Sequence, residues 1–156
     1  MRGDRLAPAL LRLALSAAFL SAVASRLGGW GGHAGQPAVA FAGFVAAVGE
    51  LNPWLPSRLW PALAVLVTAL EAGLGVALLL GVAPRRTALG AAGLLTVFAV
   101  AMTAFTGPKS ALDASVFSAA AGAFLLARVE GERSTAARDA REGAQGGAGD
   151  RCAGAS

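Results

Sequence analysis

Glu71 is an acidic residue at the centre of a long apolar run in this sequence. The run covers residues 61–83, and Glu71 lies ten residues from its start. In a helix, Thr68, Gly75 and Leu78 share its face. A carboxylate near the middle of a bilayer is costly unless it faces the protein interior and finds a partner or a proton. Glu71 is therefore the first candidate for a functional residue.

We expect Arg12 to be the partner of Glu71, so that the two form a buried functional pair. Arg12 lies about six residues inside the apolar run 6–25, roughly 9 Å from its end, and Glu71 lies roughly 15 Å from either face. An arginine side chain can cover the difference of about 6 Å and can bind a carboxylate through two hydrogen bonds. Two alternatives stay open: Arg12 extends to lipid phosphates, or the pair only locks two helices together.

Small residues recur every four positions on the run that carries Glu71, beside its face. They are Ala69, Gly73, Ala77 and Gly81. Such a ladder lets a neighbouring helix approach closely. We therefore predict that this helix is central to the fold and packs tightly along the ladder.

A short polar motif precedes the last apolar run. Lys109 and Asp113 are four residues apart, so they can pair on one face of a helix, and Ser115 follows them. Asp113 is also suited to the N-terminal end of the next helix. We interpret the three residues as a motif at the outer mouth of the fold, with a structural role as cap and interface charge.

No complete catalytic or metal-binding set is visible in the sequence. His33 is the only histidine and Cys152 the only cysteine. A metal site needs several ligands, and a redox pair of cysteines needs a second thiol. Catalytic residues are therefore unassigned, no metal is expected, and the residues favour a protein without an enzymatic activity of its own.

The composition indicates which solvent surrounds these residues. Of the 156 residues, 56% are apolar and 14% are charged, and nearly half of the charges fall in residues 128–156. Residues 1–127 carry too few charges to cover a water-facing surface, because about one residue in four is charged in soluble domains. A soluble enzyme is thereby excluded. The basic residues flank apolar runs and are not interleaved with aromatics, so no nucleic-acid partner is expected.

Four apolar runs are predicted to cross a membrane as helices, at residues 6–25, 61–83, 87–106 and 112–129. A crossing takes about 20 residues, so the fourth run is short and needs local thinning or snorkelling at its ends. The first run has a second interpretation, because Ala22-Val23-Ala24 has the form of a signal-peptidase site. Arg12 interrupts the apolar core of such a leader, which favours an uncleaved span. The predicted fold is an all-α, four-helix membrane bundle over residues 1–129.

The distribution of basic residues predicts that both termini face the cytoplasm. Ten basic residues fall on the side of the termini, and only Arg26, Arg58 and Lys109 fall on the other. Twelve arginines against one lysine, with abundant alanine and glycine, indicate a GC-rich bacterial genome. We therefore expect a multi-pass protein of the bacterial cytoplasmic membrane.

Two segments outside the predicted spans have patterns of their own. In the connection 26–60, apolar residues recur at three- and four-residue steps from Phe41 to Leu51, which predicts a short external amphipathic helix. Residues 130–156 combine glycine, alanine and balanced charges, which predicts a disordered cytoplasmic tail.

Several motifs occur in a fixed order along residues 6–128. They are Leu11-Arg12-Leu13-Ala14, Glu71-Ala72-Gly73-Leu74, Arg85-Arg86 and Lys109-Ser110-Ala111-Leu112-Asp113-Ala114-Ser115-Val116-Phe117-Ser118-Ala119. In this order they resemble the DoxX family of small four-span bacterial membrane proteins. The resemblance implies a link to membrane oxidoreductase systems, including a thiosulfate:quinone oxidoreductase subunit. No cofactor is evident from the residues themselves, and a quinone is considered only because of this resemblance. The methylamine-utilisation membrane proteins share the layout but typically carry a Cys-Gly-Cys element that this sequence lacks.

The resulting expectation is a DoxX-like, non-catalytic or quinone-side subunit of a membrane redox complex. The alternative is a membrane scaffold or assembly protein, which tolerates loss of charge at residue 71 but not bulky side chains at Gly73 or Ala77. A solute or proton carrier is disfavoured, because no inverted repeat or broken span pair is visible. The expected partners are the lipid bilayer and other membrane, periplasmic or extracellular proteins.

Overall fold

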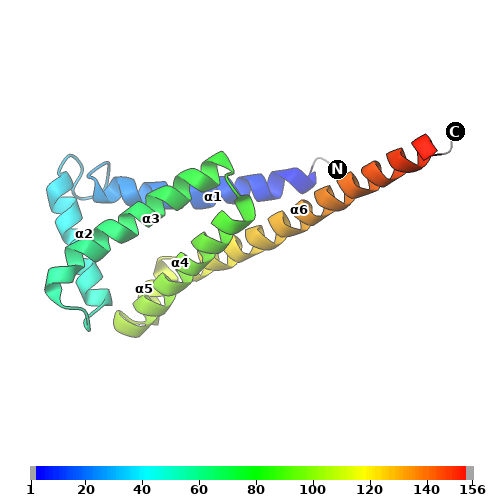
Figure 1. Cartoon of the computed structure of the whole chain (residues 1–156). Coiled ribbons are helices and arrows are strands. Elements are labelled where there is room, and N and C mark those ends of the chain that lie inside the picture. The colour runs from blue at the N-terminus through cyan, green and yellow to red at the C-terminus, as the bar shows by residue number, and fades with distance from the viewer. Residues whose placement is uncertain (1–2, 154–156) are drawn as a thin grey trace.

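The computed structural model describes residues 3–153, with the side chains of residues 6–142, and these residues form helices and turns without a β-strand (Figure 1). The helices are α1 (Gly3–Arg26), α2 (Pro37–Leu51), the 3₁₀-helix η1 (Ser57–Leu59), α3 (Trp60–Leu80), α4 (Pro84–Phe105), α5 (Pro108–Asp113) and α6 (Val116–Ala153). The all-helical class and the helix between the first two spans are as expected from the sequence.

Three helices, α1, α3 and α4, are long and apolar enough to cross a membrane. Their large apolar side chains cover the outside of the bundle. Leu66 of α3 is 55% exposed, and Val97 of α4 is 63% exposed. Exposed apolar surface of this extent is expected where lipid is the solvent, since water disfavours it. The bundle is thus built to lie within a bilayer.

The long helices pack as two antiparallel pairs, α1 with α3 and α4 with α6, and the pairs meet in one core. Alanines dominate the contact of α4 with α6, and Ala88, Ala91 and Ala123 have no exposed surface. Small side chains let the two helix backbones come close, which is how helices associate tightly in membranes. Larger residues complete the core next to these alanines, among them Leu15, Phe19, Leu78 and Leu126.

The fourth predicted span, residues 112–129, is not one uninterrupted helix. The chain turns at Ala114 and Ser115, where Ser115 has a φ of 53°, and α6 begins only at Val116. Asp113 is the last residue of α5 and therefore does not start the following helix as expected. The first half of α6 packs against α4 and α1, but charges from Arg128 onward shorten its apolar part. By length and composition, three of the described helices can therefore cross a membrane, and the fourth predicted crossing is not confirmed.

The tail that we expected to be disordered continues as helix α6 up to Ala153, and residues 154–156 lie outside the described part. Alanine, glutamate and arginine are strong helix formers, and the packed first half of α6 supplies the costly helix nucleus. Ion pairs at helical spacing add support, with Arg138 Nε 3.2 Å from Glu142 Oε1 and Arg133 Nη1 3.8 Å from Glu130 Oε1. The overall composition of residues 130–156 does not show these helix preferences of individual residues.

Helix α2 crosses one end of the bundle and packs against the start of α3 (Figure 1). Gly49 of α2 lies directly against the ring of Trp60, because a Cβ at Gly49 would stand 2.6 Å from two ring carbons. The indole nitrogen of Trp60 donates a hydrogen bond to the Leu55 carbonyl oxygen at 3.0 Å. Trp60 thereby fixes the connection that carries α2.

The first half of the small-residue ladder does not face another described helix, whereas Gly81 at its end lies against Arg12 of α1. Ala69 and Gly73 are exposed, and a Cβ added at Gly73 would meet nothing within 4 Å. Gly75 packs closely instead, since its Cβ would stand 3.0 Å from Leu20 Cγ and 3.2 Å from Phe19 Cβ. Each helical residue turns the face by about 100°, so burial of Glu71 and Gly75 rotates Gly73 towards the outside.

The two glycines of α3 give a matched pair of variants. We expect Gly75→Leu to destabilise the purified protein by ~1–3 kcal/mol or more, because the larger side chain overpacks the contact with α1. Gly73→Leu should leave the unfolding temperature in detergent nearly unchanged or raise it slightly, because leucine is the better helix former. Equal unfolding temperatures for the two variants would contradict the packing of α1 on α3 described above.

Candidate functional site

Glu71 forms a buried ion pair with Arg26, the last residue of α1. Arg26 Nη2 donates to Glu71 Oε1 at 3.0 Å, and Arg26 Nη1 donates to Glu71 Oε2. The Glu71 side chain is 3% exposed and that of Arg26 is 14% exposed. Two parallel hydrogen bonds from one guanidinium fix both the position and the plane of the carboxylate.

Neighbouring side chains hold Arg26 in place from two further helices. Thr68 Oγ1 of α3 accepts a hydrogen bond from Arg26 Nη1 at 3.4 Å and donates one to the Ala64 carbonyl oxygen at 2.8 Å. The ring of Phe44, from α2, lies over the guanidinium with its centroid 3.6 Å from Cζ. A cation over an aromatic face is attracted by the ring quadrupole. The pair thus joins α1, α2 and α3.

Arg12 is not the partner of Glu71, contrary to our expectation. Its Nε and Nη2 both donate to the Leu78 carbonyl oxygen, each at 3.2 Å, next to the C-terminal end of α3 at Gly81. The Leu78 carbonyl oxygen also accepts a hydrogen bond from the Gly81 N–H at 3.2 Å. A cation there adds donors to this carbonyl and opposes the negative end of the helix dipole. Arg12 therefore caps α3, and Gly81 leaves space for its guanidinium because a Cβ would stand 2.2 Å from Nη2.

The register between α1 and α3 explains this exchange of partners. Ser16 Oγ, one turn after Arg12, donates to the Gly75 carbonyl oxygen at 2.8 Å. This contact sets Arg12 level with Leu78, which is two turns of α3, roughly 10 Å, away from Glu71. Sequence reasoning missed Arg26 because it assigned this residue to the outer connection as a topology charge. The signal that could have found it was its place at the end of a span, from which a long side chain can extend inward.

Two apolar cavities adjoin the ion pair. A cavity of about 290 Å³ is lined by both members of the pair together with Phe19, Leu95 and Val116. A second, of about 390 Å³, lies between α2, α3 and α4 and is lined by Arg26, Phe44 and Met102 among others. Arg26 and Phe98 line both cavities. A charged group between two apolar spaces is the arrangement of a site for a largely apolar molecule with a polar group.

The guanidinium of Arg26 keeps hydrogen-bonding capacity after binding Glu71 and Thr68. A guanidinium has five N–H donors. Within the described part of the chain, Arg26 Nε has no hydrogen-bond acceptor and Nη2 has only Glu71 Oε1. The remaining donors match a carbonyl oxygen on a bound molecule.

The motif Lys109, Asp113 and Ser115 does not join the ion pair. Lys109 Nζ and Asp113 pair on α5 as expected, but their side chains are 87% and 64% exposed. The turn that contains Ser115 nevertheless lies beside the smaller cavity, because Ala114 and Val116 line it. The motif itself lines neither cavity and contributes no charge to the interior. Among the described residues no group of three histidine, cysteine, aspartate or glutamate side chains could hold a metal ion.

Comparison with known proteins assigns the family. Residues 4–118, about three quarters of the chain, match the family described as methylamine utilisation protein MauE. The chain therefore belongs to this family, and our assignment to the DoxX family was wrong. No curated protein and no solved structure matches the chain. The family and the three long apolar helices together make it a multi-pass membrane protein.

The wrong family was chosen because the missing Cys-Gly-Cys element was given more weight than the layout that both families share. The motifs that we compared mark span ends and packed faces, which are similar in small membrane bundles of the same topology. The absence of a Cys-Gly-Cys element then argued against the correct family. The match includes both Arg26 and Glu71 and ends early in α6, so the charged part of α6 lies outside the matched region.

Single and double substitutions of the buried pair test its strength. We expect Arg26→Met or Glu71→Met alone to cost about 3–5 kcal/mol of stability, because each leaves a charge buried without a partner. The double variant should recover most of this loss. Thermal unfolding of the purified protein in detergent gives the coupling free energy.

The exposed pair on α5 is the control for this cycle. Lys109→Met and Asp113→Met should each change stability by no more than about 1 kcal/mol, with a coupling near zero. Additive effects of the Arg26 and Glu71 substitutions would show that the buried pair does not hold α1 and α3 together.

Proposed function

We propose that this MauE-family protein serves methylamine utilisation as a membrane subunit of a redox system, without a complete catalytic site of its own. The observation that carries the proposal is the Arg26–Glu71 pair between two apolar cavities. In this role the pair positions a lipid-soluble, carbonyl-bearing molecule such as a quinone. The unused donors of Arg26 bind the carbonyl oxygen, and the cavity walls accept the apolar remainder.

Access from the lipid supports a lipid-soluble ligand. The larger cavity is lined by Leu66, Leu70 and Val97, and these side chains are 55%, 47% and 63% exposed on the outside of the bundle. A molecule dissolved in the bilayer can therefore approach Arg26 between α3 and α4 without crossing water. A water-soluble substrate has no comparable apolar preference for this route.

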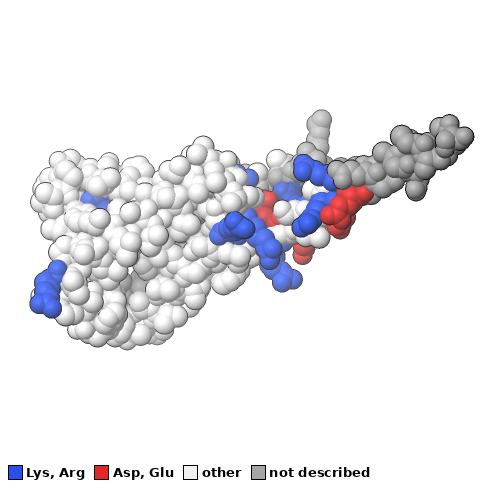
Figure 2. All heavy atoms as spheres, in the orientation of Figure 1, with Lys and Arg blue, Asp and Glu red and all other residues white. Residues whose placement is uncertain are grey.

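The charge distribution supports the orientation predicted from the sequence. Figure 2 shows a face of the bundle with little charge between its ends and a cluster of charged residues where α6 leaves the other helices. In the proposed orientation this basic end, with Arg85, Arg86 and Arg128, faces the cytoplasm. Arg26, at the opposite end of α1, then lies in the outer half of the membrane, and the redox partners are periplasmic or membrane proteins.

A scaffold without redox chemistry is the second candidate, and the exposed part of the ladder supports it. Ala69 and Gly73 present a small-residue surface on α3 that none of the described helices covers. Such surfaces let a helix of another membrane protein pack closely. A scaffold of this kind depends on Gly73 and not on the charge of residue 71.

Growth on methylamine distinguishes the two candidates. In a host that lacks its own copy of this gene, we expect the wild type and Gly73→Leu to restore growth and Glu71→Gln and Arg26→Gln to fail, at equal protein levels by immunoblot. The reverse pattern, with failure of Gly73→Leu only, would support the scaffold. Restoration by all variants would remove the pair from the function.

Quinone content of the purified protein tests the ligand directly. Loss of a hydrogen bond from a charged group costs about 1.5–3 kcal/mol, so the bound fraction in Arg26→Gln should fall by about tenfold or more at limiting quinone. Solvent extraction followed by mass spectrometry measures it, with Arg58→Gln as a control of equal charge. Equal quinone content in the two variants would overturn the proposed ligand while leaving the growth assay unaffected.

A further inference from the structure

The end of the bundle opposite to the ion pair contains basic residues from two helices. Arg85 and Arg86 lie at the start of α4, and Arg138 lies on α6 and lines the same cavity. We propose that these arginines bind the phosphate of an anionic phospholipid of the cytoplasmic leaflet. This site is separate from the Arg26–Glu71 pair and does not depend on its function.

A cavity at this end of the bundle has no carboxylate in its lining. A space of about 680 Å³ is lined by Arg85, Arg86, Arg138, Ser134, Leu89 and the turn before α4. No acidic side chain lines it. A neighbouring space of about 470 Å³ shares Arg85 but also has Glu132 and Asp139 in its wall. Carboxylates thus line the space on one side of Arg85 and not the space on the other, where Glu142 pairs with Arg138 from outside the lining.

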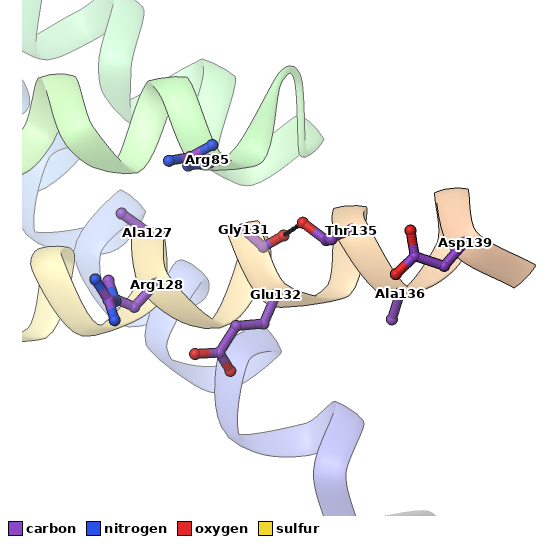
Figure 3. Close-up of a pocket in the computed structure, with 8 residues that line it drawn as sticks. All are labelled: Arg85, Ala127, Arg128, Gly131, Glu132, Thr135, Ala136 and Asp139. Atoms are coloured by element: carbon purple, nitrogen blue, oxygen red, sulfur yellow. Dashed lines mark hydrogen bonds between the residues drawn. The ribbon is translucent and has the colours of Figure 1, made fainter.

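The side chain of Arg85, from α4, lies against Gly131 of α6 (Figure 3). A Cβ at Gly131 would stand 3.2 Å from Arg85 Nε, so the glycine leaves space for the arginine side chain. In Figure 3, Glu132 extends from α6 away from α4 and away from Arg85. Among residues 6–142, Arg85 and Arg86 form no ion pair, whereas Arg138 Nε is 3.2 Å from Glu142 Oε1. Two guanidinium groups therefore remain available to an external anion.

The N-terminal end of α4 has no side-chain cap. The helix begins at Pro84, and the preceding residue, Ala83, has no side chain that could cap it. The first backbone N–H with a partner is that of Thr87, which donates to the Ala83 carbonyl oxygen at 3.0 Å. The N–H groups of Arg85 and Arg86 are therefore free within the described part of the chain. Such N–H groups and the positive end of the helix dipole favour a phosphate.

The surroundings favour a lipid over a free phosphate ion. Leu80, Val82 and Leu89 lie next to the arginines and are 70%, 55% and 45% exposed. These residues belong to the ends of the apolar spans, so they lie where the acyl chains of a lipid begin. A basic pocket between membrane helices on the cytoplasmic side, bordered by apolar residues, suits an anionic headgroup with its chains.

Lipid retention by the full-length protein tests the site. Native mass spectrometry in detergent would compare cardiolipin, phosphatidylglycerol and phosphatidylcholine as added lipids. We expect the anionic lipids to bind and phosphatidylcholine to bind weakly. At about fivefold per arginine, Arg85→Gln/Arg86→Gln should reduce the affinity for anionic lipid roughly twenty-five-fold. Arg58→Gln/Lys109→Gln removes the same charge at the opposite end and should leave the affinity unchanged.

A second pair of variants tests the cavity itself and avoids loss of any arginine. Ser134 is exposed on α6 and lines the cavity. Ser134→Glu places a carboxylate there and should weaken anionic lipid binding, whereas Ser134→Gln, of similar size, should not. Unfolding temperatures in detergent show whether every variant is folded. Added cardiolipin should raise the unfolding temperature of the wild type, of Ser134→Gln and of Arg58→Gln/Lys109→Gln, but much less that of Ser134→Glu and of Arg85→Gln/Arg86→Gln.

Three outcomes would overturn the proposal. Equal loss of lipid in Arg85→Gln/Arg86→Gln and in Arg58→Gln/Lys109→Gln would indicate a general effect of net charge. Equal affinity of Ser134→Glu and Ser134→Gln would place the lipid outside this cavity. Displacement of bound lipid by millimolar inorganic phosphate, with binding of phosphate alone, would identify a site for the free ion.

Discussion

The structure depends on the need to neutralise one carboxylate inside an apolar bundle. Glu71 lies in the middle of α3, where lipid and apolar side chains give no solvation to a charge. Arg26 meets this need by extending from the end of α1 back into the bundle. The Arg26 guanidinium is itself a largely buried charge, so it also needs favourable contacts with neighbouring side chains. Phe44 shields it from α2, which explains why a helix from the connection crosses this end of the bundle. One buried ion pair thus joins three helices at this end of the bundle.

Much of the fold could be predicted because long apolar runs allow few alternatives. The predicted spans 6–25, 61–83 and 87–106 lie close to α1, α3 and α4, and the helix between the first two spans is present as α2. The face of Glu71 with Gly75 and Leu78 is buried as its helical spacing predicts. The turn at Ser115 and the helical tail were missed for a local reason. Hydrophobicity describes which residues avoid water, but it contains no information on backbone turns or on the helix propensity of polar residues.

The candidate site was predicted only in half, because its second half depends on tertiary register. Burial of Glu71 follows from the sequence, whereas the choice between Arg12 and Arg26 depends on how far α1 is shifted along α3. A shift of two helical turns exchanges the partners, and the hydrogen bond from Ser16 to Gly75 is one of the contacts that fix it. The depth of Arg12 and Glu71 in the membrane was estimated from the ends of each apolar run separately. Such an estimate contains no information on how far one helix is shifted along another. The packing of the small-residue ladder was mispredicted for the same reason. The spacing shows which residues share a face of α3, but not which face is turned towards a neighbouring helix.

The two ends of the molecule show how burial decides what an arginine does. Arg26 is largely buried, where an unpaired charge costs several kcal/mol, so the chain supplies its own carboxylate. Arg85 and Arg86 are exposed at the end of the bundle, where a free guanidinium is affordable because water and lipid headgroups solvate it. A carboxylate within the chain would gain little there and would exclude an external anion. The lack of a carboxylate around one cavity at this end is therefore compatible with stability, and it leaves the arginines free to contact the membrane surface.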